Sequence, residues 1–441
     1  MVMYKEDYLK TGIIGVGDDE KINREKIKEI EKQINSHSRF WIKITNLGEA
    51  HNHYPRMIES ILMESETVAP RYYMYKDHKR EGGWRPVVSG CSSNTLGLSN
   101  MLSEIIESVC VAIEDPFQVI SSTDMLSRVE EFNTWIAREK EIRGDEWDWR
   151  SEYVLFGSDV KALFPSLSAE RTSKLVRKMV EKIDIDWQNL DEEWMRLYIH
   201  LNREKSSDVS EIIHLLPNKR KGRRGKEAGM SSREAKERDI RGNNLDSSWD
   251  WPERTPTERE KRKLVAICLE IGINFFFNNF GYTFGGENFL QGFGGPIGAR
   301  LTMAVARLIM QSWYDEFTKI LKENNIEEKL KGIYVDDGRG IMTKLPLGTR
   351  YQKGEGFVHK DEWQQEDVEK GENREKLTER EVGRLMNEIN PDLEFTTESE
   401  RDFDNGRLPT LSFEMWSTAN GIEHSYYEKP MRLQVLTMKR S

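Results

Sequence analysis

The spacing of apolar residues predicts helices in several parts of the chain. In the polar N-terminal segment, isoleucines recur at the interval of a helix face from Ile22 to Ile34. Residues 98–109 and 301–312 repeat this pattern. A further helix is expected to begin near Ser168, whose hydroxyl suits an N-cap. Each of these helices would bury one apolar face.

Other segments have the length and composition of strands. Residues 71–90 are rich in β-formers on both sides of a Gly-Gly pair, which predicts a hairpin. Residues 153–160 form a mostly apolar strand, and residues 332–342 predict two short strands around an Asp-Asp-Gly turn. A further β-rich stretch covers residues 408–416. Helices and strands are therefore interspersed along the chain.

The composition of the chain also indicates a long polar insertion between these elements. Hydrophobic residues make up 37% of the 441 residues and charged residues 32%, so the chain is more polar than ordinary globular proteins. Residues 202–262 carry much of this difference, because they contain charged runs and little periodic apolar content. We expect them to form a mobile inserted loop. Residues 351–385 are also charged and are expected to form a solvated loop and helix.

Charge and targeting signals narrow the class of protein. The net charge of −10 argues against a uniformly basic nucleic-acid coat, yet it leaves room for a local basic channel. The basic run at residues 219–226 is a nuclear address, a phosphate-binding patch or a solvated loop. No stretch reaches the ~18 apolar residues of a membrane span, and the N-terminus lacks a secretory signal. The three distant cysteines suit reduced thiols. We expect a soluble protein of the nucleus or cytoplasm, with no membrane partner.

Three acidic residues are candidate metal ligands. Asp159 ends the apolar strand at residues 153–160, and Asp336 and Asp337 lie at the tip of the apolar hairpin. A carboxylate in such a place is costly unless it is paired or binds a cation, and carboxylate oxygens select Mg²⁺ or Mn²⁺. Two such ions about 3.5–4 Å apart support in-line phosphoryl displacement. Taken by itself, an Asp-Asp-Gly sequence is more often a turn that only reverses the chain.

A glycine-rich segment is a candidate for close contact with a nucleotide. Gly294, Gly295 and Gly298 immediately precede the helix at residues 301–312. Such a segment lets the backbone approach a flat ligand, and the start of a helix favours phosphate. An ordinary glycine loop is an equal alternative.

Cations among aromatic residues are a second candidate. Lys76, Lys79 and Arg85 share the hairpin at residues 71–90 with tyrosines and a tryptophan. This combination suits phosphate neutralisation and base stacking. A solvated hairpin face is the alternative for any one of these cations.

In chain order, these segments resemble the motifs of a right-hand polymerase of the reverse transcriptase family. The sequence 157-GSDVKALF-164 resembles the first palm motif and 291-QGFGGPIGARLT-302 the second. The sequence 334-YVDD-337 resembles the catalytic hairpin of the third. Their order makes the joint match more specific than any one part.

A closer resemblance is to the reverse transcriptases of Penelope-like retroelements, over about residues 69–430. It rests on 76-KDHK-79, on 85-RPVVSG-90, and on Phe284 and Gly286 before the glycine segment. The sequence 408-LPTLSFEMW-416 resembles that family's primer-grip stretch. A GIY-YIG endonuclease, which many such elements carry, is not visible.

The chain also departs from the family pattern. The departures are Lys161, Pro296, Arg300 and Ser412. Lys161 lies near the expected metals, and Ser412 lies in the expected primer grip. Pro296 and Arg300 lie in the expected template contact.

The resemblance implies a role for each candidate residue. Asp159, Asp336 and Asp337 would be catalytic and hold two Mg²⁺ ions, with Mn²⁺ as the alternative. The nucleotide-binding residues would be Lys76, Lys79, Arg85, Phe164 and Gln291, with Phe164 as a steric gate against the ribose 2′-hydroxyl. Template contacts would come from Gly294, Gly295 and Gly298, and the primer grip from Leu408, Pro409 and Leu411.

The implied fold is α+β, with fingers, palm and thumb and an antiparallel palm sheet packed on helices. The segments expected are an N-terminal helical extension (1–65), fingers (66–150), the first part of the palm (151–201), the charged insertion (202–262), the second part of the palm with the YVDD hairpin (263–350), and the palm end, primer grip and thumb-like C-terminus (351–441).

The implied activity is RNA-directed DNA polymerisation by two-metal nucleotidyl transfer. The partners would be an RNA template, a DNA or RNA primer, and dNTPs. One alternative is an RNA-dependent RNA polymerase, against which Phe164 and the YVDD sequence argue. Another is a decayed element copy that binds RNA without polymerising it.

Overall fold

A computed structural model describes the chain as two compact units that each contain helices and strands. The described residues are 19–44, 68–75, 84–90, 93–113, 117–183, 190–219 and 249–427. Unit 1 comprises Met1–Glu114, Phe164–Ile309 and Leu433–Ser441, and unit 2 comprises Asp115–Leu163 and Met310–Arg432. The predicted α+β class is confirmed. None of the helices in the described part of the chain has the length and hydropathy needed to cross a membrane.

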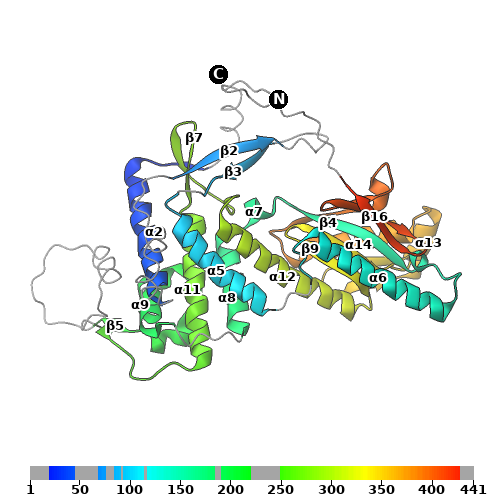
Figure 1. The fold of residues 1–441 in the computed structure, drawn as a ribbon. Coiled ribbons are helices and arrows are strands. Elements are labelled where there is room, and N and C mark those ends of the chain that lie inside the picture. Colours follow the sequence, from blue (N-terminus) through cyan, green and yellow to red (C-terminus); the bar gives the residue numbers. More distant parts are fainter. Residues whose placement is uncertain are drawn as a thin grey trace, which may run out of the picture. The chain divides into compact units, whose positions relative to one another are not determined.

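Unit 1 is built around one buried helix (Figure 1). Its helices are α2 (Arg24–Ile44), α5 (Leu96–Ala112), α8 (Ala169–Lys182), α9 (Glu192–Asn202) and α11 (Glu258–Asn278). Helix α11 contacts α5, α8 and α9. It begins with a capping box, in which Thr257 and Glu260 accept each other's backbone N–H groups. Because the stretch Leu264–Phe277 is buried except at Asn274, α11 is apolar on nearly all sides, as expected of a core helix.

A buried histidine joins three of these helices. His37 on α2 stacks on Phe275 of α11, with ring centroids 3.9 Å apart. Its Nδ1 atom lies 2.5 Å from the hydroxyl oxygen of Tyr198 on α9. Burial, helped by the charge of Lys205, lowers the pKa of His37 to about 3. His37 is therefore a neutral core residue at physiological pH.

A five-stranded sheet completes unit 1. Its strands, in spatial order, are β1 (Glu20–Lys21), β8 (Glu287–Leu290), β7 (Gly281–Phe284), β2 (Ala69–Tyr75) and β3 (Trp84–Val88). Strands β2 and β7 run parallel, and the other neighbours run antiparallel. The hairpin predicted for residues 71–90 is confirmed, since β2 and β3 pair from Arg71–Val88 to Tyr75–Trp84. Its predicted Gly-Gly turn lies outside the described residues.

The ends of the predicted insertion are folded parts of unit 1. They contain η2 (Arg203–Lys205), η3 (Ser210–Leu215), β5 (Asn218–Lys219), β6 (Trp249–Asp250) and the start of α11. Ile212, Leu215 and Trp249 are buried. Ser207 donates its backbone N–H and its hydroxyl to the buried carboxylate of Glu270. The predicted loop is therefore too long at both ends, and residues 220–248 lie outside the described residues.

Unit 2 contains the antiparallel sheet predicted around the acidic residues. Its strands, in spatial order, are β13 (Glu394–Glu398), β4 (Tyr153–Lys161), β10 (Asp337–Thr343) and β9 (Glu328–Tyr334). Every neighbouring pair is antiparallel. Strand β4 reads as a continuous apolar run because residues 153–158 are buried on both faces of the sheet.

Both faces of this sheet are covered. On one face lie α14 (Arg374–Ile389) and the C-terminal half of α12 (Arg300–Glu323), where Trp313 stacks on Phe395 of β13 at 4.2 Å between ring centroids. The other face packs on α6 (Ser122–Arg143) and on a second sheet, through a core that includes Phe132, Leu155 and Ile341. The second sheet consists of β14 (Leu408–Thr410), β15 (Phe413–Thr418) and β16 (Gly421–Tyr426).

The charged segment 351–385 is more ordered and more buried than predicted. It contributes to β11 (Thr349–Gln352), β12 (Gly356–His359), α13 (Asp361–Glu369) and α14. Asp367 and Glu381 are buried, and each pairs with arginine, Asp367 with Arg350 and Glu381 with Arg380 and Arg384. The expectation of a solvated segment is wrong at these two acids, because arginine partners allow carboxylates to enter the interior. The remaining short elements are η1 (Trp149–Ser151), α7 (Leu163–Ser166) and η4 (Glu400–Asp402).

Candidate active site

The sheet of unit 2 brings two of the predicted acids face to face. Asp337, the first residue of β10, is the register partner of Asp159 on β4. Register partners in an antiparallel sheet lie about 4.5–5.5 Å apart at Cα, and their side chains share one face. Both residues are half-buried. Two remote segments of the chain therefore place two carboxylates next to each other.

The third acid lies in the tight turn before β10. Tyr334 and Asp337 are the last register pair of β9 and β10, so Val335 and Asp336 form a two-residue hairpin turn. This confirms the predicted hairpin but not its Asp-Asp-Gly turn, since Asp337 and Gly338 belong to strand β10. Val335 has a φ of 61°, which is rare for a β-branched residue and strains the backbone. Since Asp336 adjoins Asp337, its Cα lies within about 9 Å of the Cα of Asp159.

Two further acids flank this pair on strand β13. Glu394 is the register partner of Lys161 and forms an ion pair with it. The unusual positive charge of Lys161 is therefore matched by a neighbouring acid. Glu398 is half-buried, and burial raises the pKa of its carboxyl group. The ion pair with Arg339 lowers that pKa, while the negative charges of Asp337 and Asp159 raise it. The site is thus rich in negative charge.

The donor set fits a hard divalent cation bound together with substrate. In the described part of the chain, no group of three or more His, Cys, Asp or Glu side chains converges as a ready-made metal site. Asp159 and Asp337 nevertheless present carboxylate oxygens from opposite strands on one face. Mg²⁺ is usually held by one or two carboxylates, with substrate phosphates and water completing its shell. The residues present are compatible with that mode.

The predicted primer-grip residues form a hairpin that shares a recess with Asp337. Strands β14 and β15 meet at the two-residue turn Leu411–Ser412, where Leu411 has a φ of 56°. Leu408 is fully buried in the core, and Pro409 and Leu411 are half-buried. Leu411 lines a small recess together with Asp337 and Tyr334. The structure therefore places this hairpin beside the acidic pair.

The predicted glycine segment belongs to unit 1, and steric contacts explain its glycines. A Cβ atom on Gly294 would lie 2.4 Å from the carbonyl oxygen of Pro165, and one on Gly298 would lie 2.2 Å from that of Val88. Both glycines have positive φ, 81° and 111°. A Cβ on Gly295 would lie 2.4 Å from the side chain of Thr302. Each position needs glycine because another part of unit 1 approaches it too closely.

Backbone hydrogen bonds within unit 1 join residues from three of the predicted motifs. Phe164 lies on α7 and is half-buried, and its carbonyl oxygen accepts a hydrogen bond from the N–H of Gly295 at 2.7 Å. The N–H of Val88 on β3 donates to the carbonyl oxygen of Ile297 at 2.8 Å. Phe164, the last residue of the motif at 157–164, and strand β3 are thus each joined to the glycine segment by a backbone hydrogen bond.

Gln291 and Arg300 have partners within unit 1. The side-chain amide of Gln291 donates to the carbonyl oxygens of Phe293 and Gly294, at 3.1 and 2.9 Å, so it shapes the glycine turn. Arg300, one of the departures from the family pattern, pairs with Glu104 and Glu107 on α5.

Of the three cations predicted to contact the triphosphate, the described residues include only Arg85. Arg85 is exposed on β3. Lys76 and Lys79 lie outside the described residues. Their roles stay predictions from the sequence.

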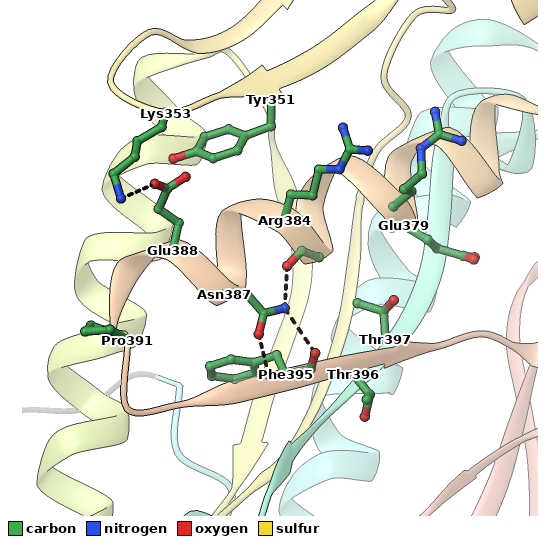
Figure 2. Close-up of a pocket in the computed structure, with 12 residues that line it drawn as sticks. Tyr351, Lys353, Glu379, Arg384, Asn387, Glu388, Pro391, Phe395, Thr396 and Thr397 are labelled. Carbon is green, nitrogen blue, oxygen red and sulfur yellow. Dashed lines mark hydrogen bonds and ion pairs between the residues drawn. The ribbon is translucent and has the colours of Figure 1, made fainter. Parts of the chain in front are cut away.

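Unit 2 also contains a large pocket, and neither Asp159 nor Asp337 lines it. It has a volume of about 730 Å³ and is lined by residues of β11, α14 and β13 and of their adjoining loops (Figure 2). Lys353 there pairs with Glu388. The amide of Asn387 bonds both backbone groups of Phe395, which closes that part of the exposed sheet edge. Since Asp159 does not line this pocket, we do not assign the chemistry to it.

Arg339 and Glu398 were not among the residues predicted from the sequence. Arg339 follows Asp337 by two residues. It is a charged residue, yet it is only 7% exposed and lies in a strand of buried residues. An arginine between two glycines in an apolar strand was the signal for it. Glu398 carries no such signal, because its position depends on the pairing of β13 with β4.

Comparison with known proteins gives structural likenesses but no family. No protein-family model matches the chain, and no curated protein matches it. Its structure is similar to that of telomerase from Candida albicans, solved in complex with a TWJ fragment of telomeric RNA, with a TM-score of 0.40 and 10% sequence identity. The match covers 87% of this chain and 50% of the telomerase chain, so this chain spans about half the length of that protein.

Proposed function

We propose that this protein is an RNA-directed DNA polymerase that extends a primer 3′ end with dNTPs. The supporting observation is the cross-strand pair of Asp159 and Asp337, with Asp336 in the adjoining turn. Like charges directly opposite each other destabilise a sheet unless a cation lies between them. This register is therefore well suited to divalent cations and costly without them.

Asp159, Asp336 and Asp337 would hold two Mg²⁺ ions, with Mn²⁺ as the alternative. When bound, such ions lower the pKa of the primer 3′-hydroxyl and neutralise the leaving pyrophosphate. The protein itself contributes by holding the three carboxylates in fixed positions. Strands β4 and β10 fix two carboxylates from opposite directions, and the two-residue turn fixes the third.

The roles proposed for unit 1 rest on the motif resemblance. Phe164 would exclude the ribose 2′-hydroxyl and so select dNTPs, and Gln291 would act with it in nucleotide binding. Gly294, Gly295 and Gly298 would contact the template. Lys76, Lys79 and Arg85 would neutralise the triphosphate. The hydrogen bond between Phe164 and Gly295 supports a shared role, because it ties the steric gate to the template segment.

The source of the chain is proposed from the same motifs. The fingers sequence, the glycine segment and 408-LPTLSFEMW-416 together favour a Penelope-like retroelement. The template would be RNA, and the primer DNA or RNA.

Primer extension on an RNA template tests the proposed function. Wild type is compared with Asp337→Asn, and with Asp361→Asn as a matched control, because Asp361 is an exposed aspartate of the same unit, on α13. We expect template-directed products with dNTPs from wild type and the control, and none from Asp337→Asn.

Two results would contradict the proposal. Incorporation of NTPs in preference to dNTPs would make the protein an RNA replicase. RNA binding without product from any variant would make it a binding protein.

A further inference from the structure

A buried arginine crosses the sheet next to the acidic pair. Arg339 lies two residues beyond Asp337 on β10, and therefore on the same face of the sheet. Its register partners are Gly157 on β4 and Gly332 on β9, neither of which has a side chain to fill that space. A Cβ atom on Gly157 would lie 3.0 Å from Nη1 of Arg339. Gly157 therefore makes room for the guanidinium group, whereas Gly332 makes room for Val119 and Met125.

The guanidinium group links the palm sheet to the β14–β15 hairpin. Its Nε donates to Oγ1 of Thr410 at 3.1 Å, and its Nη2 donates to the carbonyl oxygen of Pro409 at 2.6 Å. Its Nη2 also lies 3.1 Å from Oε1 of Glu398 on β13. Its Nη1 donates to the carbonyl oxygen of Gly338 on its own strand at 2.7 Å. One side chain thus fixes β10, β13 and β14 to one another.

We propose that Arg339 is a positioning residue that sets the place of the primer 3′ end relative to Asp159 and Asp337. The inference rests on the proposed function, because it takes the β14–β15 hairpin as the primer grip. An attacking group must lie about 3–3.5 Å from its target, and a misplacement of 1 Å can lower the rate about 100-fold. Charge-assisted hydrogen bonds from a rigid guanidinium are suited to hold such a distance.

Arginine is required for this role by its shape as well as its charge. A lysine at this position would keep a positive charge near Glu398. Its ammonium group lacks the planar fork that reaches Thr410, Pro409 and Glu398 at once. Arg339→Lys therefore loosens the hairpin while leaving the charge of the site unchanged.

Single-turnover incorporation of one dNTP tests the inference. The variants are Arg339→Lys and Thr410→Val, which removes one acceptor of the guanidinium and keeps the side-chain shape. The control is Arg407→Lys, because Arg407 pairs with Glu414 and stacks on Trp416 within the same small sheet.

We expect the rate constant to fall about 10- to 100-fold in Arg339→Lys, less in Thr410→Val, and not in Arg407→Lys. Reaction amplitude and primer–template affinity should not change in any of them. A merely structural role would instead lower the amplitude, since fewer molecules would be folded, and would leave the rate constant unchanged. That result, or an equal rate loss in Arg407→Lys, would overturn the inference.

Hydrogen exchange separates this inference from the proposed function. In Arg339→Lys, amides of residues 408–415 should exchange faster than in wild type, while those of β16 keep their protection. Unchanged exchange at residues 408–415 would overturn the inference even if wild type polymerises. An inactive wild type with the expected exchange pattern would overturn the proposed function and leave the link between β10 and the hairpin intact.

Discussion

Asp159 and Asp337 are register partners on neighbouring antiparallel strands of one sheet. The next pair, Gly338 and Ser158, is closely packed, because a Cβ atom on Gly338 would lie 2.4 Å from the hydroxyl oxygen of Ser158. A slip of one residue would move one carboxylate to the opposite face. The glycine after the two aspartates therefore serves the close packing of β10 on β4 and lies outside the turn.

Phe164→Ala should weaken selection between sugars. The proposed steric gate acts by collision of a flat ring with the ribose 2′-hydroxyl, so its removal should lower discrimination against rNTPs by about 10-fold or more. The measurement is the ratio of kcat/KM for a dNTP and the matching rNTP on one primed RNA. An unchanged ratio would remove Phe164 from this role.

Val335→Gly should leave the free energy of unfolding nearly unchanged. Val335 has a φ of 61°, and relief of that strain offsets the entropy cost of glycine, each about 1 kcal/mol. Val358→Gly on strand β12, a position without a positive φ, should instead lower the free energy of unfolding by about 1 kcal/mol. Chemical denaturation measures both. A similar loss in the two variants would show that Val335 is not strained.

Acid should destabilise unit 1 through His37. Its pKa is about 3 in the folded protein and 6.5 in the unfolded chain. Only the unfolded chain then takes up this proton as the pH falls from 6.5 towards 3. Stability from this residue is complete above pH 6.5 and falls by about 1.4 kcal/mol for each pH unit below it.

The test is the pH dependence of the free energy of unfolding between pH 6.5 and 4.5. In His37→Gln, whose amide does not titrate, the free energy of unfolding should fall by about 1.4 kcal/mol less for each pH unit than in wild type. Identical slopes in the two proteins would mean that His37 takes up its proton in the folded state.

Residues 220–248 should be replaceable by an Asn-Gly turn. Asn218 pairs with Asp250 and Lys219 with Trp249, so a two-residue turn would close β5 and β6 into a hairpin. We expect one cooperative thermal transition near that of wild type. A deletion of residues 205–260 should abolish that transition, because it removes the buried Ile212 and Trp249 and the Ser207 partner of Glu270. Equal melting of the two deletions would contradict this view of the segment.

Local features of the site could be predicted from the sequence. An apolar run ending at Asp159 and a turn at Asp336 identify β4 and the β9–β10 hairpin, because both signals lie within a few residues. The glycines at 294, 295 and 298 predicted close approach to a nucleotide, and the close neighbours that the structure shows are Pro165, Thr302 and Val88 of the same chain.

Features that depend on tertiary pairing could not be predicted. The close contact of Gly298 with Val88, and the pairing of β13 beside β4 that brings Glu398 to the site, join segments that carry no mutual signal in the sequence. Buried charges were missed for the same reason. Asp367 looks like a surface residue until its partner is known, whereas the only local sign of a buried Arg339 is its place between two glycines of an apolar strand.

Binding of Mn²⁺ tests most directly whether Asp159 and Asp337 share divalent ions. Electron paramagnetic resonance can count the bound ions in a complex of the protein with RNA template, a dideoxy-terminated primer and the next dNTP. Wild type and Asp361→Asn should bind more Mn²⁺ than either Asp159→Asn or Asp337→Asn, and both variants should lose the same ions. Equal Mn²⁺ binding by all four proteins would contradict the assignment.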